Sequence, residues 1–444
     1  MVLLLISNHI LGGSIATDYG AQANKLIAAA LADSGAYKQL GYLCNTFGPR
    51  LSGSKNLEYA LDWIISEMHQ DGFDVVKGEP VKVPVWVRGA ESARLIKPFK
   101  KDLAILGLGG SIGTPKHGIR ADVLVVDSFA ELETVKDKVK GNIVLFNAPF
   151  TSYGETVQYR YKGASEAAKY GAVASLIRSV GTATLYTPHT GMMAYTEDIP
   201  RIPHAALTIE DAIMLSRQQK SGEKIVIQLK MAASTEPDRW SRNIVADLKG
   251  SENPDEIVVV GGHIDSWDVG QGAHDNAGGC VAAWEAVRIL KKLGFRPRRT
   301  IRVVMWTNEE NGLRGAKQYR DNHLNEMDNH IIAIESDNGV FSPRGFGFTG
   351  SEVAKEKVQE AVALLQPIYA DEIFDNGVEA DIGPLKDIGV PVMSLEVDRT
   401  TYFWYHHTAA DAMDKIDREE LNRCVAALAV MSYVIADLED SLPR

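Results

Sequence analysis

The sequence predicts an α/β protein built on a three-layer α/β/α sheet, with a β-rich segment inserted into it. Two observations support this fold class. From residue 243 onwards, short apolar runs alternate with helical patterns, and this alternation is typical of a sheet covered by helices on both faces. Between residues 81 and 236, short β-like runs and glycine-rich turns predominate. The 444 residues also exceed the length of one ordinary domain.

The segment before the insertion, residues 18–80, is predicted to be helical. Residues 24–31 are rich in Ala and Leu. Residues 56–70 carry apolar side chains three and four positions apart, at Leu57, Leu61, Ile64, Ile65 and Met68. This spacing places the apolar side chains on one face of a helix. A turn-rich loop, residues 47–54, separates the two helices.

The inserted segment, residues 81–236, is predicted to hold strands at 81–87, 121–126, 141–146 and 224–229. One helix, residues 163–170, leads into a further apolar run at 172–177. Few acidic residues lie near histidines in this segment, and no catalytic grouping is visible. We therefore expect a non-catalytic inserted domain.

The C-terminal part supplies the predicted layered sheet. Its strands are expected at 257–260, 300–306, 331–334 and 391–397, and its helices at 278–293, 313–323, 352–365 and 418–438. In sheets of this kind, ligands bind outside the carboxyl ends of the strands. Candidate functional residues should therefore directly follow these strands.

Composition excludes several classes of partner. The formal net charge is −11 and no Lys/Arg cluster is present, so neither nucleic acid nor an anionic membrane is an expected partner. The three cysteines are far apart and form no CxxC motif, which argues against a disulfide framework or a structural zinc site. The N-terminal apolar run, residues 2–6, is shorter than a signal-peptide core of about 7–15 residues.

Histidine or acidic residues stand at five successive strand or loop ends of the C-terminal part. These are Gly-Gly-His263-Ile-Asp265, His274-Asp275-Asn276, Glu309-Glu310, Glu335-Ser-Asp337 and Tyr405-His406-His407. Two adjacent carboxylates after a buried strand are unfavourable unless a cation lies nearby. The set would supply two imidazoles and three carboxylates, which suits a pair of Zn²⁺ ions about 3.5–4 Å apart.

The motifs that contain these residues resemble the M28 family of zinc peptidases. The matching runs are GGHIDSWDVGQGAHDNAGG (residues 261–279), WTNEENGLRGA (306–316), ESD (335–337) and YHHTAAD (405–411). The stretch HIDSWDVGQGA is specific to the carboxypeptidase Q branch of that family. The resemblance covers nearly the whole chain, because relatives also carry a protease-associated-type insertion. It implies that residues 18–80 are the N-terminal part of the peptidase domain, 81–236 the insertion, and 237–444 the catalytic zinc peptidase domain.

The resemblance implies two Zn²⁺ ions as cofactors and five metal ligands. One zinc would be held by His263 and Asp337, the other by Glu310 and His407, with Asp275 bridging the two. In the family, the histidine ligand directly precedes a threonine, which favours His407 over His406.

The same resemblance assigns the residues around the ligands. Glu309 is expected to act as general base, and the Asp265 side chain to accept the second imidazole N–H of His263. His274 is expected to line the site. The peptide bond between Asp275 and Asn276 is expected to be cis.

The activity that the resemblance implies is hydrolysis of dipeptides or short peptides with free termini. This is a dipeptidase or carboxypeptidase reaction, in which Glu309 deprotonates a zinc-bound water and the resulting hydroxide attacks the peptide carbonyl. An aminopeptidase acting on longer peptides would use the same metal site. A single-zinc acyltransferase of the glutaminyl cyclase type and a non-enzymatic binding module are further alternatives, against which the complete ligand set argues.

Three further expectations concern the substrate and the surroundings of the protein. Donors to a substrate carboxylate are expected in residues 398–406, with Arg399, Tyr402, Tyr405 and His406 as candidates. The resemblance implies a homodimer. It also implies an extracellular or lysosomal location.

Overall fold

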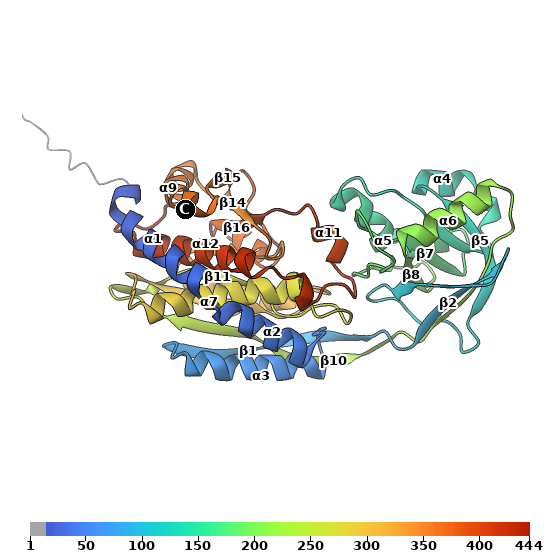
Figure 1. Cartoon of the computed structure of the whole chain (residues 1–444). Helices are drawn as coiled ribbons and strands as arrows, with labels where there is room; N and C mark the ends of the chain where they lie inside the picture. The colour runs from blue at the N-terminus through green and yellow to red at the C-terminus, as the bar shows by residue number, and fades with distance from the viewer. Residues whose placement is uncertain (1–14) are drawn as a thin grey trace, which may run out of the picture.

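The computed structural model describes residues 15–444, which form two lobes joined by a long two-stranded ribbon (Figure 1). The apolar run at residues 2–6 lies outside the described residues. The first lobe contains an eight-stranded sheet. Its strands, in spatial order, are β1 (Val75–Val87), β10 (Ser234–Leu248), β12 (Arg299–Trp306), β11 (Asn253–His263), β13 (His330–Glu335), β16 (Val392–Val397), β14 (Pro343–Thr349) and β15 (Glu372–Phe374).

The centre of the first sheet is parallel, and this arrangement positions the site. β11 pairs in parallel with β12 on one side and with β13 on the other. β12 and β13 are buried along their whole length, as expected for apolar strands covered on both faces. The register places His263 opposite Trp306 and Gly261 opposite Glu335. The residues that follow the three strands therefore meet at one edge.

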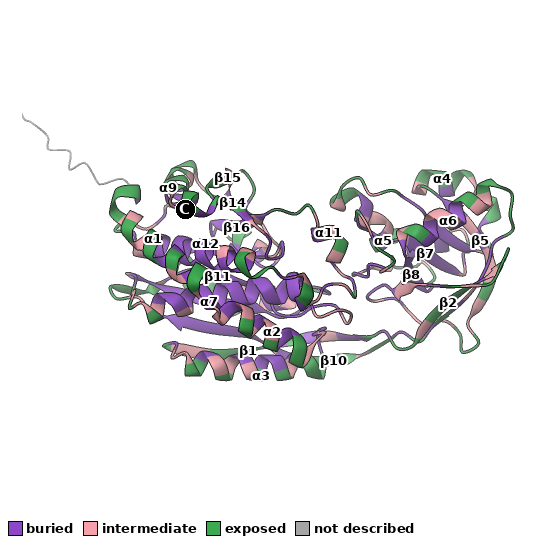
Figure 2. Cartoon of the chain, viewed as in Figure 1, coloured by how far each residue is buried: buried purple, intermediate pink, exposed green. Residues whose placement is uncertain are grey.

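Helices cover both faces of this sheet, which confirms the predicted three-layer α/β/α fold. Val258 and Val260 pack on one side with α1 (Ile15–Ala32), α2 (Gly35–Phe47), α3 (Lys55–Gln70), α7 (Gly278–Lys292), α9 (Glu352–Val362) and α12 (Arg418–Asp437). Val259 packs on the other side with α8 (Arg314–Asn322), the turn Leu324–Asn329 and α10 (Gly383–Lys386). Figure 2 shows α7 and α12 largely buried, whereas α3 exposes one face, in keeping with its apolar stripe.

The second lobe is an α/β unit and contains more helix than predicted. Its sheet has the order β3 (Lys101–Leu103), β2 (Glu91–Lys97), β9 (Val226–Met231), β5 (Ile119–Val126), β6 (Ile143–Phe146), β7 (Ala174–Arg178), β8 (His204–Leu207) and β4 (Ile105–Gly107). Three helices accompany it: α4 (Phe129–Thr134), α5 (Tyr153–Ala168) and α6 (Ile209–Lys220). The parallel run β5–β6–β7–β8 is buried by these helices.

The ribbon between the lobes is formed by β1 and β10, which pair antiparallel from Val75–Asp247 to Val87–Ser234. The domain boundaries proposed at residues 80 and 236 fall within these two strands, and the division into domains stays a prediction. The short helix α11 (Tyr402–Tyr405) lies between the lobes, beside α5 (Figure 1). None of the helices in residues 15–444 is long and apolar enough to cross a membrane.

Candidate metal centre

The residues predicted as ligands come together at the carboxyl edge of the first sheet. His263 ends β11, Glu310 follows β12, and Asp337 follows β13. Asp275 belongs to the irregular turn Ala273–Ala277 that leads into α7, and His407 follows α11. Five segments that are remote in sequence therefore deliver one ligand-type side chain each.

The contacts among these side chains place Asp275 at the centre. Nε2 of His263 lies 3.2 Å from Oδ1 of Asp275 and 2.9 Å from Oδ1 of Asp337. Nε2 of His407 lies 3.3 Å from Oδ2 of Asp275 and 3.1 Å from Oε2 of Glu310. Asp275 thus presents one oxygen to each imidazole. This is the arrangement expected of a bridging carboxylate.

Several carboxylate oxygens of the cluster lack hydrogen-bond partners, as expected of side chains that bind cations. Oδ2 of Asp275, Oε1 of Glu310 and Oδ1 of Asp337 are buried and accept no hydrogen bond in spite of the close imidazoles. A buried carboxylate oxygen without a partner is costly unless a cation compensates it. Ligand atoms within 4.8 Å of one another form two groups, His263–Asp275–Asp337 and Asp275–His406–His407. The groups share Asp275, and imidazole with carboxylate is a donor set that zinc accepts.

The electrostatics of the cluster also favour bound cations. Burial raises the pKa of Glu310 well above its usual range, and the nearby Asp275 carboxylate raises it further. Burial likewise raises the pKa of Asp337. Burial lowers the pKa of His263, but the Asp337 and Asp275 carboxylates outweigh burial and raise it well above the usual value. Protons that such a cluster takes up would be displaced by divalent cations.

Glu309, the predicted general base, is held at the start of the turn after β12. Its backbone N–H donates to Oδ1 of Asp265 at 3.1 Å. The hydroxyl of Ser52 donates to Oδ2 of the same carboxylate at 3.2 Å. Asp265 is fully buried, so its side chain links the N-terminal loop to the turn that carries Glu309.

The contact between His263 and Asp265 differs from the expectation. Nδ1 of His263 lies 3.0 Å from the backbone carbonyl oxygen of Asp265 and 3.9 Å from Oδ1 of its carboxylate. The carboxylate is engaged by Ser52 and by the backbone of Glu309. The main chain of Asp265 therefore orients the imidazole, and its side chain holds the backbone of Glu309.

The turn around Asp275 is fixed from behind by Asp411. The two carboxylate oxygens of Asp411 accept from the backbone N–H of His274 at 2.8 Å and of Asp275 at 3.1 Å. The Asp275–Asn276 peptide bond is cis, as the resemblance implies. Gly272 enters this turn with φ of 55°, and a Cβ there would lie 2.3 Å from that of Ser266. Glycine is therefore required at this position.

His274 does not line the cluster, contrary to the expectation. Its Nδ1 lies 3.3 Å from the backbone nitrogen of Val340, and its Nε2 lies 3.3 Å from the carbonyl oxygen of Lys415. The ring is stacked on Phe341 with centroids 4.1 Å apart. Both ring nitrogens are thus occupied inside the first lobe, and His274 supports the turn.

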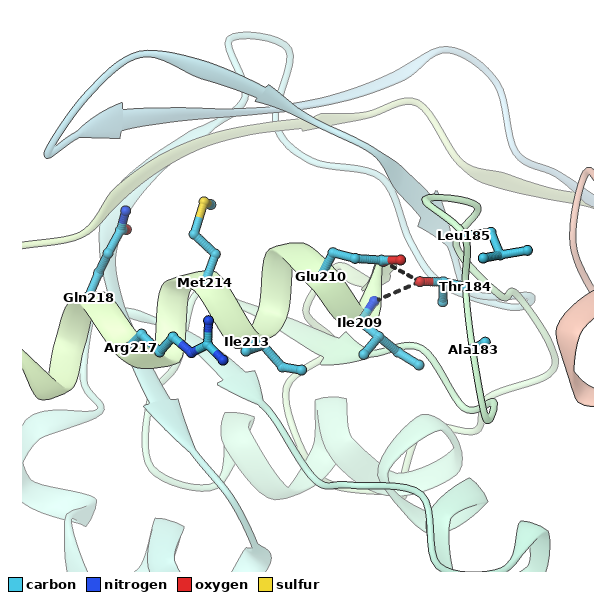
Figure 3. Close-up of a pocket in the computed structure, with 9 residues that line it drawn as sticks. All are labelled: Ala183, Thr184, Leu185, Ile209, Glu210, Ile213, Met214, Arg217 and Gln218. Atoms are coloured by element: carbon cyan, nitrogen blue, oxygen red, sulfur yellow. Dashed lines mark hydrogen bonds between the residues drawn. The ribbon is translucent and has the colours of Figure 1, made fainter.

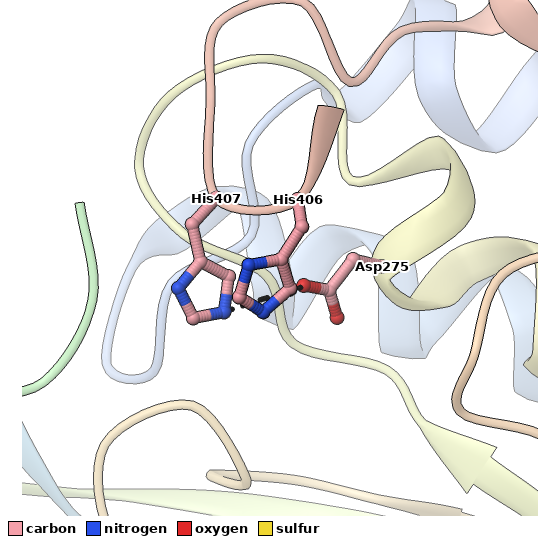
Figure 4. A group of neighbouring side chains, drawn as sticks. All are labelled: Asp275, His406 and His407. Carbon is pink, nitrogen blue, oxygen red and sulfur yellow. Dashed lines mark ion pairs between the residues drawn. The ribbon is translucent and has the colours of Figure 1, made fainter. Parts of the chain in front are cut away.

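The two adjacent histidines both face Asp275, and His407 is the nearer. Their rings are stacked with centroids 3.6 Å apart (Figure 4). Nε2 of His406 lies 3.8 Å from Oδ2 of Asp275, compared with 3.3 Å for His407. Of the two histidines, it is His407 that also contacts Glu310. The geometry therefore favours the predicted choice of His407.

The second lobe contributes to the site, which no sequence motif indicated. The backbone N–H of Thr190 donates to the carbonyl of His407 at 2.9 Å, and Nδ1 of His407 lies 3.3 Å from the carbonyl oxygen of Thr190. His407 has a positive φ of 61°, which is strained for a non-glycine residue. Arg160 and Tyr153 of α5 also reach the two histidines. Residues 81–236, which were expected to form a non-catalytic inserted domain, therefore contact the residues of the site.

A separate surface pocket of about 550 Å³ lies on the second lobe. It is formed by α6 and the loop at residues 183–185, where Thr184 accepts from the backbone of Ile209 at 3.2 Å (Figure 3). None of the residues that line it belongs to the histidine–carboxylate cluster. The pocket is thus distinct from the candidate metal centre.

Comparison with known proteins gives concordant results. The sequence profile of peptidase family M28 matches residues 243–432. The chain is 51% identical to carboxypeptidase Q of Xenopus laevis over 413 residues, which are 93% of this chain and 88% of that protein. A peptidase M28 precursor from Shewanella amazonensis SB2B has a similar structure, with TM-score 0.93, 36% identity, and coverage of 96% and 99%. A zinc aminopeptidase from Bacillus subtilis shares the fold, with TM-score 0.68, 21% identity, and coverage of 92% and 98%.

Proposed function

This chain belongs to peptidase family M28, and on that premise we propose that it is a dizinc exopeptidase that hydrolyses dipeptides or other short peptides with free termini. Family membership and the likeness to carboxypeptidase Q make the protein a hydrolase that acts as a metallopeptidase. The number of ions, the length of the peptide and the identity of the base are part of the proposal. The observation that supports it most is that Asp275 presents one carboxylate oxygen to His263 and the other to His407.

The ligand assignment follows the contacts. His263 and Asp337 would hold one zinc, Glu310 and His407 would hold the other, and Asp275 would bind both. Three carboxylates against two divalent ions leave one positive charge, which favours a negatively charged oxygen ligand between them. The relation to a zinc aminopeptidase fold is compatible with zinc as the metal.

The chemistry of the site can be divided between metal and protein. When bound, zinc would polarise the peptide carbonyl and lower the pKa of a coordinated water to about 7. Glu309 would take the proton of the attacking water and return it to the leaving amine. Asp265 would hold the backbone of Glu309 in place through the 3.1 Å hydrogen bond.

Expectations about assembly and location belong to the same proposal. A homodimer and an extracellular or lysosomal location are implied by the resemblance and stay predictions. Neither affects the ligand set, since every proposed ligand comes from one chain.

The proposal is tested by measuring hydrolysis of a panel of dipeptides and longer peptides with zinc present and after chelation. We expect dipeptides to be cleaved, activity to be lost with the chelator and zinc to restore it. Efficient cleavage of the N-terminal residue from long peptides with no cleavage of dipeptides would establish the aminopeptidase alternative. Activity that survives complete removal of metal would contradict the proposal.

A further inference from the structure

Arg160 is a buried arginine whose charge is not matched by a carboxylate. Arg160 is 6% exposed to solvent. Among residues 15–444, its partners are the Tyr153 hydroxyl at 2.9 Å, the Thr190 carbonyl at 3.4 Å and Nδ1 of His407 at 3.4 Å, and no acidic side chain forms an ion pair with it. Its Nε is buried and has no hydrogen-bond partner. A buried charge is normally paired, so Arg160 is a candidate to bind an anion.

Other buried arginines of this chain show that the situation of Arg160 is unusual. Arg302 forms two hydrogen bonds with Asp247, at 2.7 and 2.9 Å. Arg50 has no acidic partner either, but its Nε, Nη1 and Nη2 donate to four backbone carbonyls. Those guanidinium groups are satisfied within the protein, whereas that of Arg160 retains donor capacity.

Arg160 stands immediately beside the candidate metal centre. It contacts Nδ1 of His407, the imidazole whose Nε2 faces Asp275 and Glu310. Tyr153 extends the same surface, with its ring edge-on to His406 at 5.4 Å and stacked on Phe403 at 5.3 Å. α5, which carries both residues, lies beside α11 (Figure 1), and Tyr153 contacts Phe403 of that helix.

The hydroxyl of Tyr153 is oriented for donation. Because it accepts a hydrogen bond from Nη2 of Arg160, its own proton is directed elsewhere, and the described part of the chain offers no acceptor for it. Burial raises the pKa of Tyr153, and the carboxylates of Glu309 and Asp275 also contribute. The phenol therefore stays protonated.

From these contacts we infer that Tyr153 and Arg160, two residues of the second lobe, bind the C-terminal carboxylate of the substrate. This inference rests on the proposed function. In a dipeptide the reacting carbonyl and the free carboxylate are one residue apart, about 3.3–3.6 Å along the chain. The carboxylate must then lie next to the metal ligands, where Arg160 is found. A guanidinium and a hydroxyl together give the charge-assisted hydrogen bonds that a carboxylate prefers.

Arg399, the arginine expected from sequence to serve this purpose, is already engaged. It donates to Oδ1 of Asn338 at 3.0 Å and to Oε2 of Glu396 at 3.1 Å, and its side chain is 50% exposed. Its charge is thus compensated on the protein surface. Arg160 of the second lobe would instead bind the carboxylate and restrict cleavage to peptides with a free carboxylate at short distance.

The test compares a dipeptide with its C-terminal amide as substrates of the zinc-loaded protein. The unaltered protein should prefer the free carboxylate by about 100-fold in kcat/KM, which corresponds to about 2.7 kcal/mol at about 1.36 kcal/mol per tenfold. Arg160→Met should abolish this preference, mainly through KM for the dipeptide, so that kcat/KM falls more for the dipeptide than for the amide. Tyr153→Phe keeps the ring contacts and should reduce the preference by about tenfold. Arg217→Met, at an exposed position on α6, is the control and should leave both substrates unaffected.

Each other outcome has a defined meaning. Equal losses on both substrates in Arg160→Met would assign Arg160 to positioning His407 and would overturn the inference. Equal turnover of dipeptide and amide by the unaltered protein would overturn it independently of whether the variants fold. If the unaltered zinc-loaded protein cleaves neither substrate, the proposed function fails and the inference fails with it.

Discussion

Replacing Glu309 with Gln should remove the base while leaving the metal centre intact. The change is nearly isosteric, and the hydrogen bond that holds this turn uses the backbone N–H of Glu309, so the turn should persist. General-base catalysis contributes about 10²–10⁴-fold. The other carboxylates of the cluster, Asp275, Glu310 and Asp337, already contact the imidazoles, so none is free to replace Glu309. We therefore expect a loss near the upper end, about 10³–10⁴-fold in kcat, or about 4–5.4 kcal/mol.

The assay is steady-state hydrolysis of a dipeptide together with metal analysis and thermal unfolding of the same samples. Glu310→Gln is the matched comparison, because it changes the neighbouring carboxyl in the same way. Glu309→Gln should retain all its zinc and its melting temperature, whereas Glu310→Gln should lose zinc as well as turnover. A Glu309→Gln protein that retains kcat within about tenfold would refute the assignment of the base. Loss of zinc from it would show that Glu309 is a ligand.

Three further outcomes are expected. His407→Ala should lower the zinc content and His406→Ala should not, as measured by metal analysis of the purified proteins; the reverse result would make His406 the ligand. Chelation should lower the melting temperature by roughly 10 °C. A ligand present at about 1,000 times its Kd stabilises the folded protein by about 4 kcal/mol, and each kcal/mol raises the melting temperature by about 2–4 °C. An unchanged melting temperature would contradict tight zinc binding. Burial raises the pKa of Glu79, but hydrogen bonds from His323 and Lys77 outweigh burial and hold it at about 2, so Glu79→Gln should reduce the free energy of unfolding by about 2 kcal/mol at neutral pH. Because the folded-state pKa is depressed, this difference should persist above about pH 4.5 and disappear as pH falls towards about 2 in chemical unfolding experiments; a difference that grows on acidification would contradict the assignment.

Most elements of the first lobe could be predicted because burial imposes a pattern on their sequence. β11, β12 and β13 each contain a short apolar run, and α7 and α12 are buried along most of their length. β14 was not predicted, since its sequence Pro-Arg-Gly-Phe-Gly-Phe-Thr has the composition of a turn. Its glycines are explained only by tertiary contacts. A Cβ on Gly345 would lie 1.8 Å from the carbonyl oxygen of Glu372, and one on Gly347 would lie 1.9 Å from that of Asn376.

The candidate site also contains some residues that could be predicted from the sequence and others that could not. Most ligand-type residues could be predicted because they stand at or soon after the end of a buried strand, as His263 does, or in a glycine-flanked turn, as Asp275 does. The role of Asp265 was only partly predictable, since residue type does not decide whether the carbonyl or the carboxylate meets His263. Arg160 could not be predicted, because it lies 247 positions from His407 in a segment without any local motif. Only the packing of the second lobe against α11 brings them together.

The number of zinc ions bound per chain tests the central claim most directly. The protein should be loaded with zinc, freed of excess ions and analysed by native mass spectrometry alongside Asp275→Ala. Two zinc ions per chain are expected for the unaltered protein, and fewer for the variant, because Asp275 is the carboxylate that contacts both His263 and His407. A single ion in the unaltered protein, or two ions retained without Asp275, would contradict a bridged dizinc centre.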